Sequence, residues 1–282
     1  MYRLLAIDID GTLVNSRDEL TPATRAALAR AGAAGVHVVL ATGRRYSHAL
    51  PLVKELEIDV PLVTASGALV KDPIDHRTLY QAEFEPQTLR DVVAIVDAAG
   101  FDLVLCGDTF AEGFDFYHAR PNPRTPELAY YLAMNPGRSR LWPDLLSDPP
   151  PGVFGGFVVG TLEQMRDLDS LTRRQMPGKL HTHVLHPPRY RGFFTEISPA
   201  GVTKWSAIQR LAADWGIAES EICAVGDDVN DIAMIRAAGL GVAMGNAQPE
   251  VKEAADRIAP THDQDGLVQV VEWVLEGRGT RG

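Results

Sequence analysis

The feature that most constrains this chain is an apolar run that ends in two carboxylates. Leu4–Ile7 leads directly into Asp8-Ile9-Asp10-Gly11-Thr12. Because side chains alternate along a strand, Asp8 and Asp10 should project to one side while Ile9 enters the core. Carboxylates at a buried strand end lose water, and a bound cation would offset that cost. Taken alone, the segment is equally compatible with an ordinary polar junction between a strand and a loop.

Strands and helices alternate in the N-terminal part. The apolar pattern predicts a parallel sheet with helices on its faces, because its strands are separated by helices. Such sheets place ligands at the carboxyl ends of their strands, where Asp8 and Thr42 lie. The expected strands are Leu4–Asp8, Val36–Ala41 and Pro61–Thr64, and the expected helices are Thr21–Ala34, with Thr21 as N-cap, and Ser47–Leu56.

The alternation is interrupted between about Phe84 and Pro188 and then returns. The fold class we expect is α/β, with a doubly wound, Rossmann-like parallel sheet built from residues 1–83 and 189–282 and an inserted α+β domain at 84–188. Within the insertion we predict helices at 87–99 and 161–175, strands at 102–106, 114–118, 154–159 and 181–185, and a loop at 136–156. After it we predict helices at 203–215, 231–238 and 266–276 and strands at 222–226 and 240–244.

Composition excludes several classes of protein. The 282 residues include 27 Lys and Arg against 37 Asp and Glu, and the net charge of −10 argues against a nucleic-acid-binding surface. No apolar stretch approaches membrane-spanning length, and the N-terminal apolar run is too short for a signal peptide. The two cysteines, Cys106 and Cys223, lack zinc-site spacing. We therefore expect a soluble cytoplasmic protein with no nucleic-acid or membrane partner.

Two short segments could contact an anion. Thr42-Gly43-Arg44 follows a predicted strand, where Thr42 offers a hydroxyl and Gly43 allows close backbone approach. Lys204 opens a predicted helix, and its charge opposes the helix dipole there unless an anion binds between them. An ordinary turn and a solvated lysine are the simpler explanations for each segment alone.

A second strand runs into carboxylates at Gly226-Asp227-Asp228-Val229-Asn230-Asp231. An EF-hand calcium loop that began at Asp227 would need glycine sixth and glutamate twelfth, where this chain has Ile232 and Ala238. A Mg²⁺ site with few carboxylates, several waters and a substrate phosphate fits better. A solvated acidic loop stays open as the alternative.

Together these segments resemble the haloacid dehalogenase superfamily, in particular the Cof-type phosphatases with a large C2B cap. The inserted domain lies where that cap would be, although it matches mainly in size and position. The resemblance spans nearly the whole chain. The matching residues, in the family's order, are Asp8-x-Asp10-Gly11-Thr12, Thr42-Gly43-Arg44, Lys204, Gly226-Asp227-Asp228-x-Asn230-Asp231, Gly245-Asn246-Ala247 and Asp265-Gly266.

By this resemblance the first two carboxylates divide the chemistry. Asp8 would attack phosphorus and form an aspartyl-phosphate. Asp10 would protonate the leaving oxygen and then take a proton from the hydrolytic water. Relatives with threonine at the second position do other chemistry, so Asp10 implies phosphate-ester hydrolysis or phosphomutase activity.

The resemblance also implies how a metal and a substrate would be held. Mg²⁺ would lie between the Asp8 carboxylate, the Asp10 backbone carbonyl and Asp227, with Asp228 and Asp231 as further candidates. Asp231 could instead orient Lys204. The substrate would be a small phosphorylated metabolite, with sugar phosphates as the leading class. Its phosphate would be held by Thr42, Gly43, Lys204 and Asn230.

Two positions depart from the family pattern. Ala65-Ser66-Gly67 stands where many relatives have Ser-Asn-Gly, and Trp205 stands where glycine is common. Trp205 should therefore pack under the cap or narrow the site. Two other functions stay open, a phosphomutase on the same scaffold and a non-catalytic phosphate-binding module, although the intact Asp8, Asp10 and Lys204 argue against the second.

Several residues of the insertion could contact a substrate or a metal. The substrate candidates are Tyr117, His118, Arg120 and Tyr190, each of which is more simply a surface or cap-core residue. Histidines 181, 183 and 186 are close together in sequence. We expect them to share a solvated face of a strand rather than bind a metal. The oligomeric state stays open.

Overall fold

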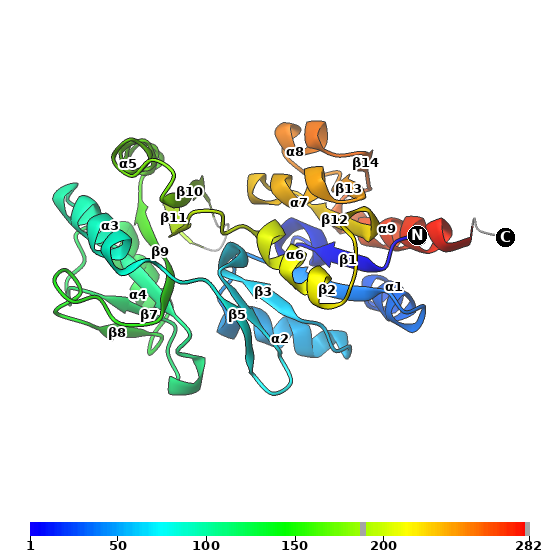
Figure 1. The fold of residues 1–282 in the computed structure, drawn as a ribbon, viewed down its shortest axis with the longest axis horizontal. Helices are drawn as coiled ribbons and strands as arrows, with labels where there is room; N and C mark the ends of the chain where they lie inside the picture. The colour runs from blue at the N-terminus through cyan, green and yellow to red at the C-terminus, as the bar shows by residue number, and fades with distance from the viewer. Residues whose placement is uncertain (187–189, 280–282) are drawn as a thin grey trace. The chain divides into compact units, whose positions relative to one another are not determined.

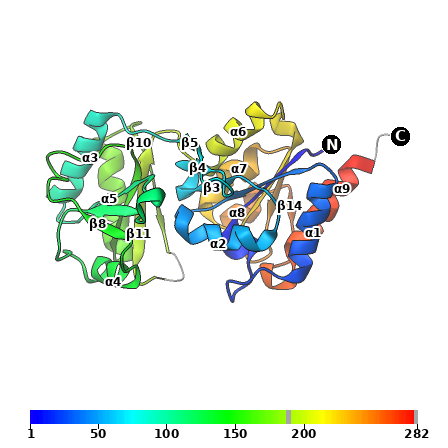
Figure 2. The same cartoon turned by 90° about the horizontal axis from the view of Figure 1, so that it is seen from below.

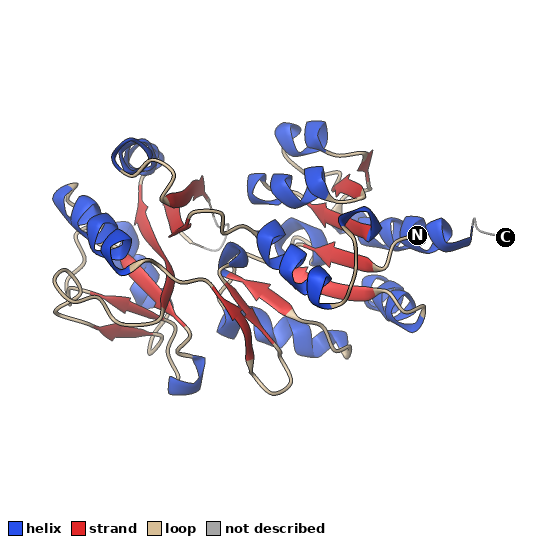
Figure 3. Ribbon diagram, viewed as in Figure 1, coloured by secondary structure: helices blue, strands red, loops and turns tan. Residues whose placement is uncertain are grey.

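The computed structural model describes residues 1–186 and 190–279. It divides into two compact units, a core unit of Met1–Tyr80 with Thr203–Gly282 and an inserted unit of Gln81–Val202. The core unit contains an eight-stranded sheet and the inserted unit a six-stranded sheet (Figure 3). The predicted α/β fold, with a parallel sheet and an α+β insertion, is confirmed.

The centre of the core sheet is formed by β1 (Leu4–Ile7), β2 (His37–Ala41) and β12 (Ile222–Gly226) (Figure 1). Both neighbours run parallel to β1, and Ile7 pairs with Leu40 on one side and Val225 on the other. The three strands therefore end at one edge, and the loops that follow them meet there. The sheet order is β14 (Arg257–Ile258), β13 (Leu240–Ala243), β12, β1, β2, β3 (Leu62–Thr64), β4 (Leu69–Lys71) and β5 (Thr78–Gln81).

Helices cover both faces of the core sheet. Leu4 and Ala6 pack in one buried cluster with residues of α6 and α7, and strand alternation sends Leu5 and Ile7 to the opposite face. Two other helices, α1 and α9, lie side by side, away from α6 (Figure 2). The helices are α1 (Pro22–Ala33), α2 (Tyr46–Leu56), α6 (Lys204–Asp214), α7 (Ile232–Ala237), α8 (Pro249–Ala254) and α9 (Gly266–Gly279).

Local sequence explains where two of these helices begin. Thr21 caps α1 by accepting the N–H of Thr24, and proline fills the first helical position. Thr203 caps α6 by accepting the N–H of Ser206 at 3.1 Å, which places Lys204 in the first turn. Trp205 is buried in the hydrophobic cluster of the core unit. Packing within the core unit therefore accounts for the burial of Trp205, and a narrowing of the site by this residue stays a prediction.

The inserted unit packs its sheet against α3 (Pro86–Ala98) and α5 (Leu162–Gln175), and α4 (Pro126–Met134) contacts β9. Its pairs are antiparallel except β7 with β8, which is parallel. The sheet order is β10 (Leu180–Leu185), β11 (Phe193–Pro199), β9 (Val153–Gly160), β6 (Val104–Gly107), β7 (Phe116–His118) and β8 (Ser139–Leu141).

Several elements were not predicted. The stretch 136–156, expected to be a loop, contains β8 and the start of β9. The expected boundary between 188 and 189 falls outside the described residues, but β11 pairs with β9 and β10. Residues 193–199 therefore belong to the inserted unit, and their assignment to the core domain is wrong. The other missed elements are α4, α8, β4, β5 and β14.

Candidate active site

Three carboxylates and one lysine meet where β1 and β12 end. Oxygen atoms of Asp8, Asp227 and Asp231 lie within 4.8 Å of one another. Lys204 Nζ donates to Asp8 Oδ1 at 2.6 Å and to Asp231 Oδ1 at 2.7 Å. Asp8, Asp231 and Lys204 are 4%, 0% and 1% exposed, so most of this charge is withdrawn from water.

The electrostatics of this carboxylate cluster favour a cation. Burial raises the pKa of Asp8 well above its ordinary value, against the effect of Lys204. Burial, with Asp231 and Asp228 nearby, raises the pKa of Asp227 to about 7. Burial alone would lower the pKa of Lys204, but Asp231 and Asp8 raise it above its ordinary value. Three carboxylates against one ammonium leave two formal negative charges, which a divalent cation with a preference for oxygen ligands, such as Mg²⁺, would neutralise.

Glycine is required at two positions in the loops that carry these carboxylates. Gly11 has a φ of +75°, and a Cβ there would lie 2.2 Å from Asp227 Oδ2. A Cβ on Gly226 would lie 2.3 Å from Asp231 Cγ. The close approach of the two loops therefore depends on the absence of a side chain at Gly11, and the packing of Asp231 against the end of its own strand depends on the absence of a side chain at Gly226.

Asp231 organises the site through both of its oxygens. Oδ1 accepts from Lys204, and Oδ2 accepts the backbone N–H groups of Asp227 and Asp228, each at 3.1 Å. The carboxylate of Asp228 lies outside the cluster of three, where it accepts from Val229 N at 2.7 Å and from Gln248 at 2.5 Å. This geometry favours Asp231 as the residue that orients Lys204 and argues against Asp228 as a metal ligand.

The carboxylate of Asp10 lies apart from the cluster. Arg44 binds both of its oxygens, with Nη2 to Oδ1 at 2.7 Å and Nε to Oδ2 at 2.9 Å, and Arg44 also donates to Asp18. The Arg44 side chain is 11% exposed while that of Asp10 is 52% exposed. Burial alone would lower the pKa of Arg44, but Asp10 and Asp18 raise it. The Asp10 carboxylate is therefore not one of the carboxylates that lie close enough together to hold a metal.

The remaining predicted phosphate-binding residues lie on neighbouring loops. The Thr42 hydroxyl is buried and accepts the backbone N–H of Arg44 at 3.0 Å, and Gly43 lies between them. The Ser66 N–H donates to the Thr42 carbonyl at 3.0 Å, so the Ala65-Ser66-Gly67 turn supports this loop. Asn230 Oδ1 is buried without a hydrogen-bond partner among the described residues. Buried acceptors are normally satisfied, so this oxygen is suited to a ligand that donates a hydrogen bond or to a cation, and a phosphate would have to be bound by the Asn230 Nδ2 instead.

Sequence reasoning missed three contributors to this site. Arg44 was recognised in its motif but given no partner, and Thr12 donates its hydroxyl to Asp227 Oδ1 at 3.3 Å. Asn246, which follows β13, donates to the same carboxylate. All three residues lie in the segments that resemble the family, and this was the one signal in the sequence that they belong to the site. Their partners could not be predicted, because each hydrogen bond joins residues far apart in the sequence.

The family model for haloacid dehalogenase-like hydrolases matches residues 5–271, nearly the whole chain. The chain belongs to this family. The resemblance noted from the sequence motifs is therefore confirmed, and with it the prediction of a hydrolase.

Relatives and solved structures agree with this assignment. This hydrolase is 31% identical to YxeH of Bacillus subtilis over 98% of the chain and 99% of the relative. It is 28% identical, over 97% and 96% of the two chains, to YcsE of the same organism, named 5-amino-6-(5-phospho-D-ribitylamino)uracil phosphatase. A haloacid dehalogenase-like hydrolase from Bacteroides thetaiotaomicron matches with a TM-score of 0.78 and 28% identity, covering 97% of this chain and all of that one. Phosphatase is the activity that the family and these relatives support.

The candidate substrate residues of the inserted unit all have partners within it. Tyr117 is buried in the hydrophobic cluster, and His118 Nδ1 lies 2.8 Å from the Arg120 carbonyl. The Arg120 guanidinium binds Asp97 and Asp102. Tyr190 donates to Asn135 Oδ1 at 3.3 Å. These contacts favour structural roles for all four residues in this hydrolase.

The three histidines lie on or near β10. His183 is 15% exposed and its Nε2 lies 3.0 Å from Glu196 Oε2, while burial lowers the pKa of His181. The expected solvated face is therefore only partly observed, because His183 is partly buried beside Glu196, its partner on β11, whereas His186 is exposed. Throughout residues 1–186 and 190–279, the cluster around Asp8 is the one group of three acidic, cysteine or histidine side chains close enough to hold a metal.

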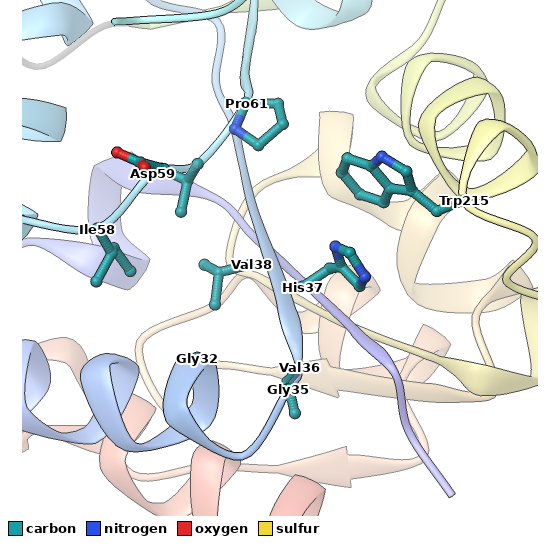
Figure 4. Close-up of a pocket in the computed structure, with 10 residues that line it drawn as sticks. Gly32, Gly35, Val36, His37, Val38, Ile58, Asp59, Pro61 and Trp215 are labelled. Atoms are coloured by element: carbon teal, nitrogen blue, oxygen red, sulfur yellow. The ribbon is translucent and has the colours of Figure 1, made fainter.

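A separate pocket of about 420 Å³ lies in the core unit of this hydrolase (Figure 4). Its lining includes His37, at the start of β2, and Pro61, just before β3. The Trp215 ring, which also lines the pocket, stacks on the His37 ring with 4.6 Å between the ring centroids. Parallel strands begin at the edge of the sheet opposite to their ends, so this pocket is remote from the carboxylate cluster. No helix in the described part of the chain is long and apolar enough to cross a membrane.

Proposed function

We propose that this hydrolase is a Mg²⁺-dependent phosphatase that cleaves phosphate monoesters of small metabolites through phosphorylated Asp8. The observation that carries the proposal is the buried contact of 2.6 Å between Asp8 and Lys204 beside Asp227. An ammonium group there can hold a phosphoryl oxygen next to the attacking carboxylate, and positioning with electrostatic stabilisation supplies most of the catalysis of phosphoryl transfer.

In the first step a carboxylate oxygen of Asp8 forms a bond to phosphorus, and the bond from phosphorus to the ester oxygen breaks. Asp10 donates a proton to the departing alcohol. In the second step Asp10 takes a proton from water, whose oxygen bonds to phosphorus and displaces Asp8. Mg²⁺, held by Asp8, Asp227 and the Asp10 carbonyl, would reduce the repulsion between the anionic substrate and these carboxylates. Thr42, Gly43, Lys204 and Asn230 would hold the phosphate.

The substrate class follows from the relatives rather than from the site. YcsE is named for a substrate with a phosphorylated ribityl chain. A small phosphorylated sugar or ribityl compound is therefore our first candidate for this chain, and a cytoplasmic location remains a prediction. A screen of phosphorylated metabolites with phosphate release as the readout identifies the substrate.

The test of this function is hydrolysis of p-nitrophenyl phosphate with and without Mg²⁺. We expect Asp8→Asn to lower kcat by at least about 10³-fold, because the amide cannot form the phosphorylated intermediate. Acid quenching of the wild-type protein with labelled substrate should yield labelled protein, and the variant should yield none. Asp214→Asn, which removes an exposed acid at the end of α6, is the matched control and should retain full activity. Activity that survives Asp8→Asn would contradict the mechanism.

A further inference from the structure

A third loop clamps the two loops that carry the proposed metal ligands. Asn246 lies in the loop after β13 and is half-buried. Its Nδ2 donates to the Gly11 carbonyl at 2.8 Å and to Asp227 Oδ2 at 3.3 Å, and its Oδ1 accepts the N–H of His262 at 3.0 Å. One side-chain amide thus joins the Asp8 loop, the Asp227 loop and the segment before α9, and all of its usual hydrogen-bonding groups are engaged.

The backbone around Asn246 is held in place independently of its side chain. The Met244 N–H donates to the Gly226 carbonyl at 3.0 Å, and the Gln248 N–H donates to the Asp227 carbonyl at 3.1 Å. The Gly245 N–H donates to the Pro260 carbonyl at 3.2 Å. The loop should therefore keep its path when the Asn246 side chain is removed, so that a variant reports on the amide itself.

The amide acts on the orientation of Asp227. Thr12 donates to Oδ1 of this carboxylate at 3.3 Å and Asn246 to Oδ2, so each oxygen has one neutral donor. Neutral donors fix the plane of a carboxylate without cancelling its charge. The contact of Asn246 with the Gly11 carbonyl also sets the spacing between the Asp8 loop and the Asp227 loop.

We propose that Asn246 is a positioning residue that sets the affinity of the site for Mg²⁺ through Asp227 and the Gly11 carbonyl. The inference rests on the proposed function, because it assumes that Asp8 and Asp227 hold Mg²⁺. Partners that orient metal ligands typically contribute about 10-fold to 100-fold to metal affinity. Asn246 touches neither phosphorus nor the leaving group in this assignment, so its loss should weaken Mg²⁺ binding and leave the chemistry of the loaded site intact.

Gln248 provides a matched control in the same loop. Its amide Nε2 donates to Asp228 Oδ1 at 2.5 Å, next to Asp227 in sequence, but Asp228 lies outside the carboxylate cluster. Asn246→Ala and Gln248→Ala therefore each remove one side-chain amide bound to an aspartate. A nonspecific effect of loosening this loop would appear in both variants.

The experiment is calorimetric titration of Mg²⁺ into protein stripped with EDTA. We expect Asn246→Ala to raise the Kd for Mg²⁺ by about 10-fold to 100-fold and to regain wild-type kcat at saturating Mg²⁺, while Gln248→Ala keeps the wild-type Kd. An unchanged Kd in Asn246→Ala, or an equal loss in both variants, overturns the proposal. A kcat that saturating Mg²⁺ does not restore also overturns it, since that result indicates damage to the fold.

A second measurement needs no variant. In the wild-type protein, the side-chain amide NMR signals of Asn246 should shift during the Mg²⁺ titration with the same midpoint as the calorimetric binding, and those of Gln248 should shift less. Signals of Asn246 that do not move overturn the proposal even if Asn246→Ala fails to fold. If the wild-type protein binds no Mg²⁺, the metal dependence of the proposed function fails together with this inference, whereas wild-type binding with an unaffected variant removes this inference alone.

Discussion

The two units differ in whether their buried carboxylates are balanced by positively charged partners. In the inserted unit, Asp102 is 5% exposed and binds the Arg120 guanidinium at 2.6 Å and the Arg124 N–H at 2.7 Å. In the core unit, the cluster of Asp8, Asp227 and Asp231 surrounds Lys204 and keeps an excess of negative charge. Removing one partner of a buried ion pair destabilises a fold, whereas an excess of buried charge is typical of a functional site that a ligand completes.

The largest combined effect on stability and activity is expected from removing the lysine of the cluster. Lys204→Met leaves three carboxylates without a counter-charge, and breaking a buried ion pair typically costs about 3–5 kcal/mol of stability. The loss of a donor to the transferring phosphoryl group should also lower kcat by about 10²-fold to 10³-fold. Urea unfolding and hydrolysis of p-nitrophenyl phosphate measure the two effects.

The counterpart in the inserted unit is Asp102→Asn. It should reduce the free energy of unfolding, because the Arg120 guanidinium and the backbone N–H of Arg124 lose a charged acceptor, but leave kcat unchanged. If Lys204→Met and Asp102→Asn lowered kcat equally, the assignment of a catalytic role to the Lys204 cluster and a structural role to Asp102 would be contradicted.

A smaller effect is expected at Arg44, which holds the Asp10 carboxylate by two hydrogen bonds. Arg44→Met should lower kcat/KM for an alkyl phosphate by about 10²-fold, at the low end of what a general acid contributes, because Asp10 is no longer held in place. For p-nitrophenyl phosphate, whose leaving group departs without a proton, the loss of kcat/KM should be several-fold at most, because kcat/KM reports the first step and Asp10 acts as a base only in the second. If both substrates lose equally, Arg44 contacts the phosphate rather than positioning Asp10.

The smallest effect sharpens the contrast through pH. Glu85 caps α3 by accepting hydrogen bonds from Thr88 and Gln87. These hydrogen bonds, of which the one from the Thr88 hydroxyl has the largest effect, lower the pKa of Glu85. At Asp227, in contrast, burial raises the pKa. A lowered pKa in the folded state adds stability above the unfolded pKa of a glutamate, and that stability is lost as pH falls through the lowered value. The Tm difference between wild type and Glu85→Gln should therefore be larger at pH 7 than at pH 3. An equal Tm difference at both pH values would mean that the charge of Glu85 does not contribute.

Elements with strong local signals were predicted closely. The strand Ile222–Gly226 was predicted to the residue, and Thr21 with Pro22 marked the start of α1. The start of α4 carries the same signal, Thr125 followed by Pro126, but it was overlooked, and no element was predicted between residues 118 and 136. In contrast β11 depends on partners on both sides in space, β9 and β10, so its membership in the inserted sheet could not be derived from local pattern.

The order of polar residues at the ends of β1, β2 and β12 is a property of the sequence alone, because strand alternation and apolar runs are local. That order was enough to predict an oxygen-lined site and to favour Mg²⁺ over a calcium loop. Which acids are neutralised is a property of the fold. Asp10 pairs with Arg44 and Asp231 with Lys204 across 34 and 27 residues of chain, and Asn246 reaches Asp227 across 19. Only the meeting of separate loops makes these pairs, and they leave Asp8 and Asp227 as the proposed metal ligands while they hold Asp10 beside Arg44, outside the carboxylate cluster.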